Sequence, residues 1–324
     1  MSHNEQPQAP AALPPVLVVM APTASGKSRL CMAVARRVGG EILSVDALKV
    51  YRGLEAGTAK PSAEERAEIP HHGLDLVDAG TDYSVALYLD YALPVLRDIV
   101  ARGKVPILDA TAPYYLKALV FGLDRGPEPR AEFRQVAEQR PLGDLYAELL
   151  AKDPESARRI GPGDRKRLVR ALEIAEYSGR LASQFVRWGE PLPGLRWVFT
   201  GIEWPRDVLY ARVRERALRM FEQGWLDEVQ AVRAGGGVSR TAGLAHGYRR
   251  LQQHLDGELT LAEAQEQTVR DVKQFARKSM TFFRRFPRTQ WLQVQSDAEL
   301  DRAALYLAHE VAEMQAEFLR TPGP

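Results

Sequence analysis

The sequence contains only one cysteine, Cys31, so no disulfide can form within the chain. It also lacks an uninterrupted apolar run of about 18 residues, the length that a membrane-spanning helix requires. A positively charged segment followed by an apolar one, which would direct export, is missing as well. We therefore expect a protein of the cytoplasm with no membrane span.

An excess of charge of one sign is missing too, because 44 Lys and Arg residues stand against 42 Asp and Glu residues. The formal net charge of +2 does not predict a nucleic-acid ligand, so any such prediction must rest on local clusters. With 45% apolar and 27% charged residues, the composition is that of a soluble globular protein. At 324 residues, the chain exceeds the length at which one core usually stops growing, which predicts an insertion or a second domain.

Short apolar runs alternate with helical patterns in the N-terminal half of the chain. Val16–Met20 is a continuous apolar run, typical of a strand buried on both faces. Similar runs occur at Glu41–Val45 and Val105–Leu108, the second after a helical stretch at Val85–Ala101, and Arg196–Ile202 is again β-rich. Strands alternating with helices predict a mostly parallel sheet with ligands at the carboxyl ends of its strands.

The rest of the chain divides by composition. Residues 1–14 are polar and rich in Pro and Ala, and we expect them to form a disordered tail. Residues 124–194 read as charged amphipathic helices broken by Gly and Pro, which predicts a helical insertion domain. The core domain then comprises residues 15–123 and 195–318, the second segment ending in helices.

The loop Ala21-Pro22-Thr23-Ala24-Ser25-Gly26-Lys27-Ser28 separates the first strand from its helix and matches G-x-x-x-x-G-K-[ST] except at Ala21. In such a loop, backbone N–H groups and the lysine bind phosphate oxygens, and the hydroxyl binds Mg²⁺. We expect all eight residues to bind the phosphates of a ligand, with Ser28 as the Mg²⁺ ligand. Alanine at position 21 costs stability if its φ is positive. The motif does not identify the phosphate compound.

This loop and the blocks after it resemble the tRNA dimethylallyltransferases, also called tRNA isopentenyltransferases. The second block matches the family almost throughout: Ser44-Val45-Asp46, Val50-Tyr51-Arg52-Gly53-Leu54 and Gly57-Thr58-Ala59-Lys60-Pro61. Further matches follow in the family's order over nearly the whole chain: Pro70-His71-His72, Asp153-Pro154, Arg167-Leu168-Val169-Arg170-Ala171-Leu172-Glu173, Gly247-Tyr248-Arg249 and Lys273-Gln274-Phe275-Ala276-Arg277-Lys278.

The resemblance implies an α/β fold: a P-loop NTPase-like core with a mostly parallel sheet, plus a helical insertion domain. It implies transfer of a dimethylallyl group from dimethylallyl diphosphate to N6 of adenosine 37 of tRNA, beside the anticodon, with release of diphosphate. Asp46 is then the proton acceptor, Lys27 with Mg²⁺ stabilises the leaving diphosphate, and Thr111 is a further catalytic residue. The expected partners are the tRNA anticodon loop and the prenyl donor, and we expect a monomer.

The residues expected to bind tRNA fall in the family's motifs and in basic clusters. They are Asp46, Ala47, Leu48, Lys49, Ala112, Arg134, Lys166, Arg167, Leu168, Val169, Arg170, Gly247, Tyr248, Arg249, Lys273, Arg277 and Lys278. Seven basic residues and one acidic residue lie between Arg270 and Arg288. A helical wheel puts the cations on one stripe opposite an apolar face: Arg270, Lys273, Gln274, Arg277, Thr281 and Arg284 against Val269, Val272, Phe275, Ala276 and Phe283.

Two departures from the family bear on activity. Where the family has G-G-T-G after a strand, this chain has Asp109-Ala110-Thr111-Ala112, which puts Ala112 at the family threonine. Only a shift of the loop brings the Thr111 hydroxyl to the diphosphate. Lys273 replaces a family arginine, and an ammonium is a poorer bidentate phosphate ligand than a guanidinium. Both changes predict reduced activity.

Two alternatives stay open. Asp109 ends an apolar run, as does the acid that holds Mg²⁺ in P-loop NTPases, so the chain can instead be a small-molecule kinase or another nucleotide-dependent enzyme. The altered loop at residues 110–112 is also what a tRNA-binding relic with weakened activity would carry. His71 and His72 have no third partner at metal-ligand spacing and are interpreted as a packed pair.

Overall fold

The structure is a computed structural model that describes residues 12–123, 125–185 and 188–320. The chain forms two compact units, one consisting of Phe121–Glu190 and the other of the segments before and after it. Of the expected disordered tail, residues 1–11 lie outside the described residues. No helix among the described residues is both long and apolar enough to cross a membrane.

The larger unit is built on a six-stranded sheet in which every pairing is parallel. The strand order is β4-β2-β6-β1-β7-β8. Their bounds are Pro15–Met20 for β1, Glu41–Val45 for β2, His71–His72 for β4, Pro106–Ala110 for β6, Arg196–Glu203 for β7 and Gln290–Gln293 for β8. A second sheet pairs β3 (Tyr51–Arg52) with β5 (Val77–Asp78). The predicted parallel sheet is thus confirmed, with strand ends shifted by one or two residues.

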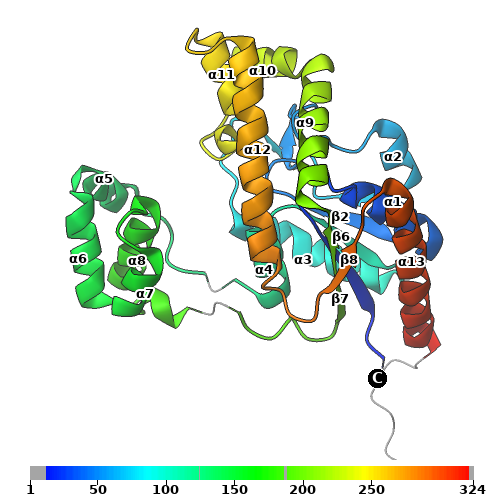
Figure 1. The fold of residues 1–324 in the computed structure, drawn as a ribbon. Coiled ribbons are helices and arrows are strands. Elements are labelled where there is room, and N and C mark those ends of the chain that lie inside the picture. Colours follow the sequence, from blue (N-terminus) through cyan, green and yellow to red (C-terminus); the bar gives the residue numbers. More distant parts are fainter. Residues whose placement is uncertain (1–11, 124, 186–187, 321–324) are drawn as a thin grey trace, which may run out of the picture. The chain divides into compact units, whose positions relative to one another are not determined.

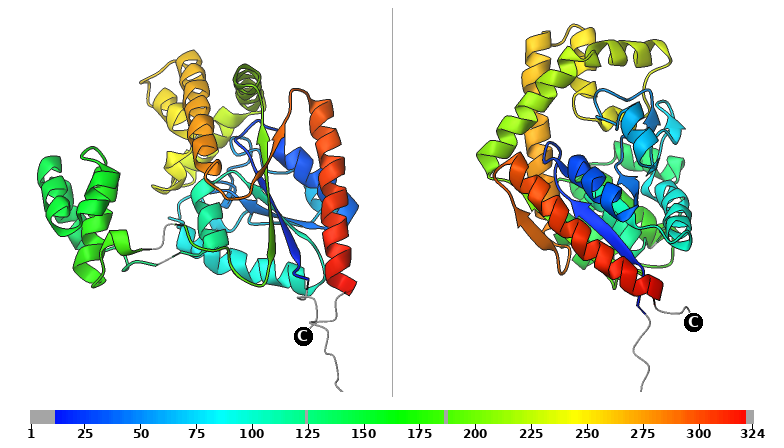
Figure 2. Two further views of the ribbon diagram at one scale, coloured as in Figure 1. Left: turned by 60° about the horizontal axis from the view of Figure 1, so that its bottom comes forward. Right: turned by 90° about the vertical axis from the view of Figure 1, so that its right-hand side faces the viewer.

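Helices cover both faces of the sheet, which explains the continuous apolar runs in its central strands. On one face, α1 (Lys27–Val38) and α13 (Asp297–Arg320) pack against Leu17 and Val19 of β1. On the other face lie α3 (Val85–Ala101) and α4 (Pro113–Phe121) (Figures 1 and 2). Helix α3 has the predicted bounds, and Ser84 caps its N-terminus by accepting a hydrogen bond from the Leu87 N–H.

A layer of helices stands over the carboxyl ends of the strands (Figure 1). It consists of α9 (Arg206–Glu222), α10 (Trp225–Ala234), α11 (Tyr248–Leu255) and α12 (Leu261–Phe283), and α2 (Ala63–Glu68) lies in the loop region of the core. Helix α9 leads out of β7, and α12 packs against both α9 and α11. Ligands of parallel sheets bind at the carboxyl ends of the strands, so this layer roofs the region where a site is expected.

Trp225, at the start of α10, is held between two glycines of the motif blocks. A Cβ atom at Gly57 would lie 2.1 Å from Nε1 of the indole, and one at Gly247 would lie 2.1 Å from its Cη2. Gly247 also has a φ of +88°, which side chains other than glycine rarely adopt. Both glycines are therefore needed for the indole to pack against the backbone.

We expect Gly57→Ala to lower the free energy of unfolding by about 1–3 kcal/mol, because the added methyl group overpacks the Trp225 ring. Urea unfolding followed by circular dichroism measures this change. Gly80→Ala is the control, since nothing lies within 4 Å of a Cβ atom there. Equal stabilities of the two variants would contradict the tight packing of Gly57 against the Trp225 ring.

Glu41, the first residue of β2, is 5% exposed and joins the edge of the sheet to α3. Its carboxylate accepts a hydrogen bond from Arg102 Nη2 at 2.9 Å and lies 2.8 Å from His72 Nε2. The hydrogen bonds from Arg102 outweigh burial and, with the His72 ring, lower the pKa of Glu41 to about 2. His71 Nδ1 lies 2.7 Å from the Ile69 carbonyl oxygen. The histidine pair is therefore structural, as predicted.

The lowered pKa of Glu41 makes stability depend on pH. The unfolded carboxyl titrates near its ordinary value, so the stabilisation is complete above about pH 5 and is lost as the pH falls toward 2. Between these limits, we expect the free energy of unfolding to fall on the order of 2–3 kcal/mol further in the natural protein than in Glu41→Gln. Urea unfolding across this pH range tests it, and parallel curves would contradict it.

The smaller unit is a helical bundle of α5 (Ala131–Gln139), α6 (Leu142–Lys152), α7 (Pro154–Ile160) and α8 (Arg165–Tyr177). Asp153 caps α7 through the Ser156 N–H and also accepts the Ser183 N–H at 2.9 Å, which explains the Asp153-Pro154 motif. The buried Glu173 carboxylate accepts hydrogen bonds from Arg134 and Arg170. These bonds, with one from a backbone N–H, outweigh burial and lower the pKa of Glu173.

Candidate active site

The phosphate loop runs between β1 and α1 and is fixed from outside by side chains of the segment after β7. Arg212 Nε donates to the Ala24 carbonyl oxygen at 2.9 Å, and Trp204 Nε1 donates to that of Ser25 at 2.9 Å. The Arg212 guanidinium also lies over the Trp204 ring at 4.4 Å. With these carbonyl groups bound, and no side chain capping α1, the loop presents its free N–H groups to an anion.

The alanine at position 21 does not strain the loop. Ala21 is fully buried at the end of β1 and is not among the described residues with positive φ. The left-handed positions of the loop are Ala24, with a φ of 64°, and Gly26, with a φ of 80°. The conformational cost expected at Ala21 is therefore absent. Ala24 is instead the residue of the loop that adopts a left-handed conformation without being glycine.

The loop borders a small cavity of about 120 Å³ at the carboxyl end of β1. Besides Pro22 to Ser28, it is lined by Arg29, Asp46, Lys49, Thr58, Thr111 and Arg216. The Ser25 hydroxyl is buried with no hydrogen-bond partner among the described residues. A buried hydroxyl without a partner is costly, so a ligand atom in this cavity would restore a hydrogen bond.

Positive charge dominates the small cavity. Lys27 forms an ion pair with Asp109, and Lys49 Nζ lies 3.7 Å from the same carboxylate. Burial, and next the Lys49 ammonium, lower the pKa of Lys27 to about 7, while Cys31 and the Asp46 carboxylate oppose the shift. Burial also lowers the pKa values of Lys49 and Arg216. In each case, burial and neighbouring cations destabilise the charged form, and an anionic ligand in the cavity would stabilise it.

Two neighbouring oxygen ligands fit a magnesium ion: Ser28, which lines this cavity, and Asp109, which is hydrogen-bonded to it. The Ser28 hydroxyl donates to Asp109 Oδ2 at 2.9 Å, which brings a hydroxyl and a carboxylate together beside the phosphate loop. Mg²⁺ prefers such hard oxygen ligands and usually keeps water or phosphate oxygens in its remaining positions. No group of three or more His, Cys, Asp and Glu residues among those described could hold a metal by itself.

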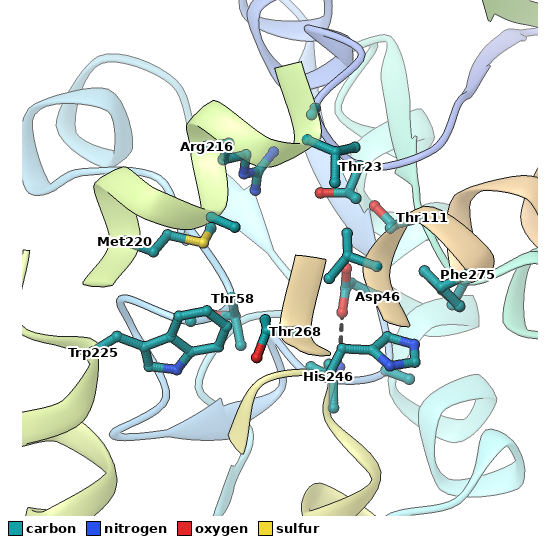
Figure 3. A pocket seen from close by; sticks show the side chains of 18 of the residues that line it. Thr23, Asp46, Thr58, Thr111, Arg216, Met220, Trp225, His246, Thr268 and Phe275 are labelled. Atoms are coloured by element: carbon teal, nitrogen blue, oxygen red, sulfur yellow. Dashed lines mark hydrogen bonds between the residues drawn. The ribbon is translucent and has the colours of Figure 1, made fainter. Parts of the chain in front are cut away.

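A larger cavity of about 330 Å³ adjoins the small one beneath the helical layer (Figure 3). The two share Thr23, Ala24, Asp46, Thr58, Thr111 and Arg216. The remaining lining is mostly apolar: Ala47, Leu48, Gly57, Tyr83, Ala112, Tyr115, Val213, Ala217, Met220, Trp225, Thr241, His246, Thr268, Val272 and Phe275. One continuous site thus offers a cationic end and an apolar end.

Asp46 lies at the junction of the two cavities. Its Oδ1 accepts hydrogen bonds from the N–H groups of Leu48, at 2.8 Å, and Lys49, at 3.3 Å. This local turn fixes the carboxylate, and Oδ2 has no hydrogen-bond partner among the described residues. A half-buried carboxylate with a free oxygen beside an anion-binding pocket has the geometry of a general base.

The loop after β6 brings Thr111, rather than Ala112, to this junction. The N–H groups of both residues donate to the Val45 carbonyl oxygen, at 3.1 and 3.0 Å. Thr111 lines both cavities, whereas Ala112 lines only the larger one. Thr111 therefore occupies a position from which a hydroxyl can reach a ligand in the small cavity.

The predicted cationic stripe of α12 is exposed at Arg270, Arg277 and Arg284, with Arg284 just beyond the last helical residue. Lys273 is half-buried, with its ammonium 5.5 Å from the centre of the Tyr210 ring. The opposite face is apolar as predicted: Val269, Ala276 and Phe283 are buried, while Val272 and Phe275 line the larger cavity. Lys278 is exposed.

Several residues expected to bind tRNA lie in the core instead. Tyr248 is 1% exposed and donates its hydroxyl to Glu228, beside the buried Gly247. Leu168 and Val169 belong to the core of the helical unit. Their contact with RNA stays a prediction, although in this structure neighbouring residues enclose the side chains of Tyr248, Leu168 and Val169.

Other residues expected to bind tRNA remain accessible. Arg249, Lys166 and Arg167 are exposed, and Arg134 and Arg170 are partly exposed while paired with Glu173. Ala47 and Leu48 line the larger cavity, and Lys49 lines the small one. For these residues, contact with tRNA stays a prediction.

Arg216 and Trp225 were not predicted as site residues, although both line the larger cavity. In the sequence, Arg216 is one of many charged residues of an amphipathic helix. The one sequence feature that could have indicated a site residue is its position between Val213 and Met220, which lie on the inner face of α9. That the Arg216 guanidinium is buried beside this face becomes evident only from the packing of α9 in the structure.

Comparisons with known proteins identify the family of this chain. A family model described as IPP transferase matches residues 49–286. The tRNA dimethylallyltransferase of Streptomyces coelicolor is 41% identical over 304 residues, which cover 91% of this chain and 96% of that protein. That of Pelotomaculum thermopropionicum is 36% identical over 301 residues, covering 91% and 95%.

A solved structure is similar over the same length. The tRNA isopentenylpyrophosphate transferase of Bacillus halodurans matches with a TM-score of 0.68 at 30% identity, covering 93% of this chain and 98% of that chain. This chain therefore belongs to the tRNA dimethylallyltransferase family and has its P-loop NTPase-like fold.

Proposed function

We propose that this protein transfers a dimethylallyl group from dimethylallyl diphosphate to N6 of adenosine 37 of tRNA and releases diphosphate. The observation that carries this proposal is the junction at Asp46, where a cationic cavity meets an apolar one. A prenyl diphosphate has the same two parts, an anionic head and an apolar tail. Membership of the family supports the choice of donor and of acceptor.

The chemistry follows from the positions of these groups. The lone pair of N6 attacks C1 of the allylic group, a C–N bond forms, and the C1–O bond to diphosphate breaks. The extra proton on N6 passes to the free oxygen of Asp46, while negative charge grows on the departing diphosphate. Lys27, Arg216 and the N–H groups of the loop stabilise that charge, and the apolar lining excludes water from the reactive carbon.

Ser28 and Asp109 would hold Mg²⁺ in this reaction. When bound, the ion supplies positive charge to the diphosphate oxygens and so favours departure of the leaving group. The Thr111 hydroxyl would take the place of the family threonine, because it lines both cavities although the sequence puts it one position early. The departures at residues 110–112 then preserve activity rather than abolish it.

We further propose that the exposed cations of α12, with Arg249, bind the backbone phosphates of the anticodon stem and loop. The accessible cations of the helical unit, Lys166 and Arg167 among them, would add contacts to the same tRNA. We also propose that the protein acts as a monomer in the cytoplasm.

A nucleotide-dependent P-loop enzyme is the second candidate, because Ser28 and Asp109 are paired as in sites that hold a magnesium nucleotide. The apolar lining of the adjoining cavity disfavours it, since an acceptor of a phosphoryl group needs polar contacts. A tRNA-binding relic is the third candidate. The intact Lys27 and Asp46 at one junction disfavour that one.

One assay separates the three candidates. Purified protein is incubated with unmodified tRNA, labelled dimethylallyl diphosphate and Mg²⁺, with ATP in a parallel tube. Label in tRNA without ATP is the expected result. ATP hydrolysis without transfer would support the nucleotide-dependent enzyme, and tRNA binding with neither reaction would support the relic.

A further inference from the structure

The larger cavity has two chemically different sides. Val213, Ala217 and Met220 of α9 form an aliphatic side that ends at Trp225. Figure 3 shows Arg216, Met220 and Trp225 along one side of the cavity, with Thr111, Phe275 and His246 opposite them. The second side also carries Asp46 and can donate, accept and stack, as a nucleobase requires. On the aliphatic side, Val213, Ala217 and Met220 offer only apolar contact.

The aliphatic side leads directly away from the phosphate pocket. Arg216 lines both cavities, and Met220 lies one helical turn further along α9, about 6 Å along the axis. Val213, Ala217 and Met220 are 2%, 4% and 9% exposed, so this wall is closed to solvent. A chain whose diphosphate lies against Arg216 therefore meets Met220 after roughly one isoprene unit and Trp225 directly behind it.

Trp225 cannot move back to lengthen this space. Gly57 and Gly247 press on two edges of the indole at distances that would exclude even a Cβ atom. The Tyr248 ring packs edge-on at 5.6 Å between centres, and the Phe221 ring lies at 5.0 Å. Glu228 holds the surrounding loop by accepting the N–H groups of Glu55 and Ala56, at 2.7 and 2.6 Å. The indole is thus a rigid end wall.

We propose that the aliphatic side of the larger cavity holds the prenyl tail and that Trp225 limits the donor to one isoprene unit. Trp225 is then the residue that determines donor specificity, selecting dimethylallyl diphosphate against longer allylic diphosphates. This inference rests on the proposed function, since it names the part of the same site that selects the donor by the length of its prenyl chain. The added isoprene unit of geranyl diphosphate would collide with the indole, whereas its diphosphate and allylic carbon are identical.

The test compares the two donors in Trp225→Ala. The ratio of kcat/KM for geranyl diphosphate to that for dimethylallyl diphosphate, both with tRNA as acceptor, is measured by mass spectrometry of tRNA digests. We expect the ratio to rise at least tenfold in Trp225→Ala and less in Trp225→Phe. Met220→Ala opens the same wall without changing the packing of Gly57 and Gly247 against the indole. We expect the ratio to rise in this variant also. It therefore serves as the second variant if Trp225→Ala folds poorly.

Trp291→Ala is the matched control, because Trp291 is a half-buried tryptophan that packs on Gly201 at the β8 edge of the sheet. We expect its donor ratio to equal that of the natural protein. An unchanged ratio in both Trp225→Ala and Met220→Ala would overturn the inference, as would a loss confined to KM for tRNA, which would assign this wall to the nucleobase. Activity of the natural protein with dimethylallyl diphosphate tests the proposed function separately.

Discussion

Replacing Asp46 by asparagine is expected to lower kcat for prenyl transfer by about 10²–10⁴-fold, the usual contribution of a general base. The amide oxygen of asparagine can still accept the hydrogen bonds from the N–H groups of Leu48 and Lys49, so the turn that positions the side chain survives. What is lost is the oxygen that takes the proton from N6. Single-turnover transfer of label to tRNA measures this loss at saturating donor.

The dissociation constant for tRNA serves as the second readout for this variant. We expect it to change less than about threefold, because the backbone phosphates provide most of the affinity of proteins for nucleic acids. Asp207→Asn, which neutralises an exposed carboxylate in the first turn of α9, is the matched control for turnover. Unchanged turnover in Asp46→Asn would remove Asp46 as the base.

Replacing Arg216 by glutamine is expected to lower kcat by about 10²–10³-fold, as when one donor to a developing anion is removed from an enzyme site. Arg216 is the side chain of α9 that reaches both cavities. In the proposed mechanism the C1–O bond breaks at the junction of these cavities, so the contribution of the guanidinium grows as charge moves onto the diphosphate. Steady-state kinetics with varied dimethylallyl diphosphate measure it.

Two further variants sharpen this prediction. Arg219→Gln removes a guanidinium from the exposed side of the same helix, where it lies 3.4 Å from Glu215, and we expect wild-type kinetics. Arg216→Lys keeps the charge but loses the planar fork, so we expect partial recovery. If Arg216→Gln raised only KM for the donor and left kcat intact, Arg216 would bind the ground state without favouring the transition state.

The fold could be predicted from the sequence wherever the signal is local. Strands such as Val16–Met20 are buried on both faces, so their apolar runs are continuous and identify a parallel sheet. The glycine, lysine and serine of the phosphate loop lie between a strand and a helix, which fixes the place of the ligand. The wheel of α12 likewise predicted which of its faces is buried.

The walls of the site could not be predicted, because they depend on contacts between distant segments. Trp225 lines the larger cavity only since Gly57 and Gly247, far apart in the chain, meet around it. For the same reason, Tyr248 looks like a polar motif residue in the sequence but is enclosed by Trp225 and Glu228. Motif position alone does not distinguish a residue that builds the wall from one that faces the ligand.

The departures from the family acquire a physical meaning in this packing. Asp109 contacts Lys27, Ser28 and Lys49 at once, so the added carboxylate compensates the charge of a second buried lysine. Thr111 lies at the junction of the cavities, although the sequence puts Ala112 at the family threonine. We therefore expect this loop to reduce activity less than the sequence alone indicates.

The most direct measurement is a crystal structure of the protein with an unreactive sulfur analogue of dimethylallyl diphosphate, Mg²⁺ and an anticodon stem-loop. The account predicts diphosphate against Lys27 and Arg216, the prenyl tail along α9, and N6 of the adenine within hydrogen-bond reach of Asp46. A donor analogue bound elsewhere, or an adenine that cannot reach Asp46 while the small cavity is filled, would contradict it.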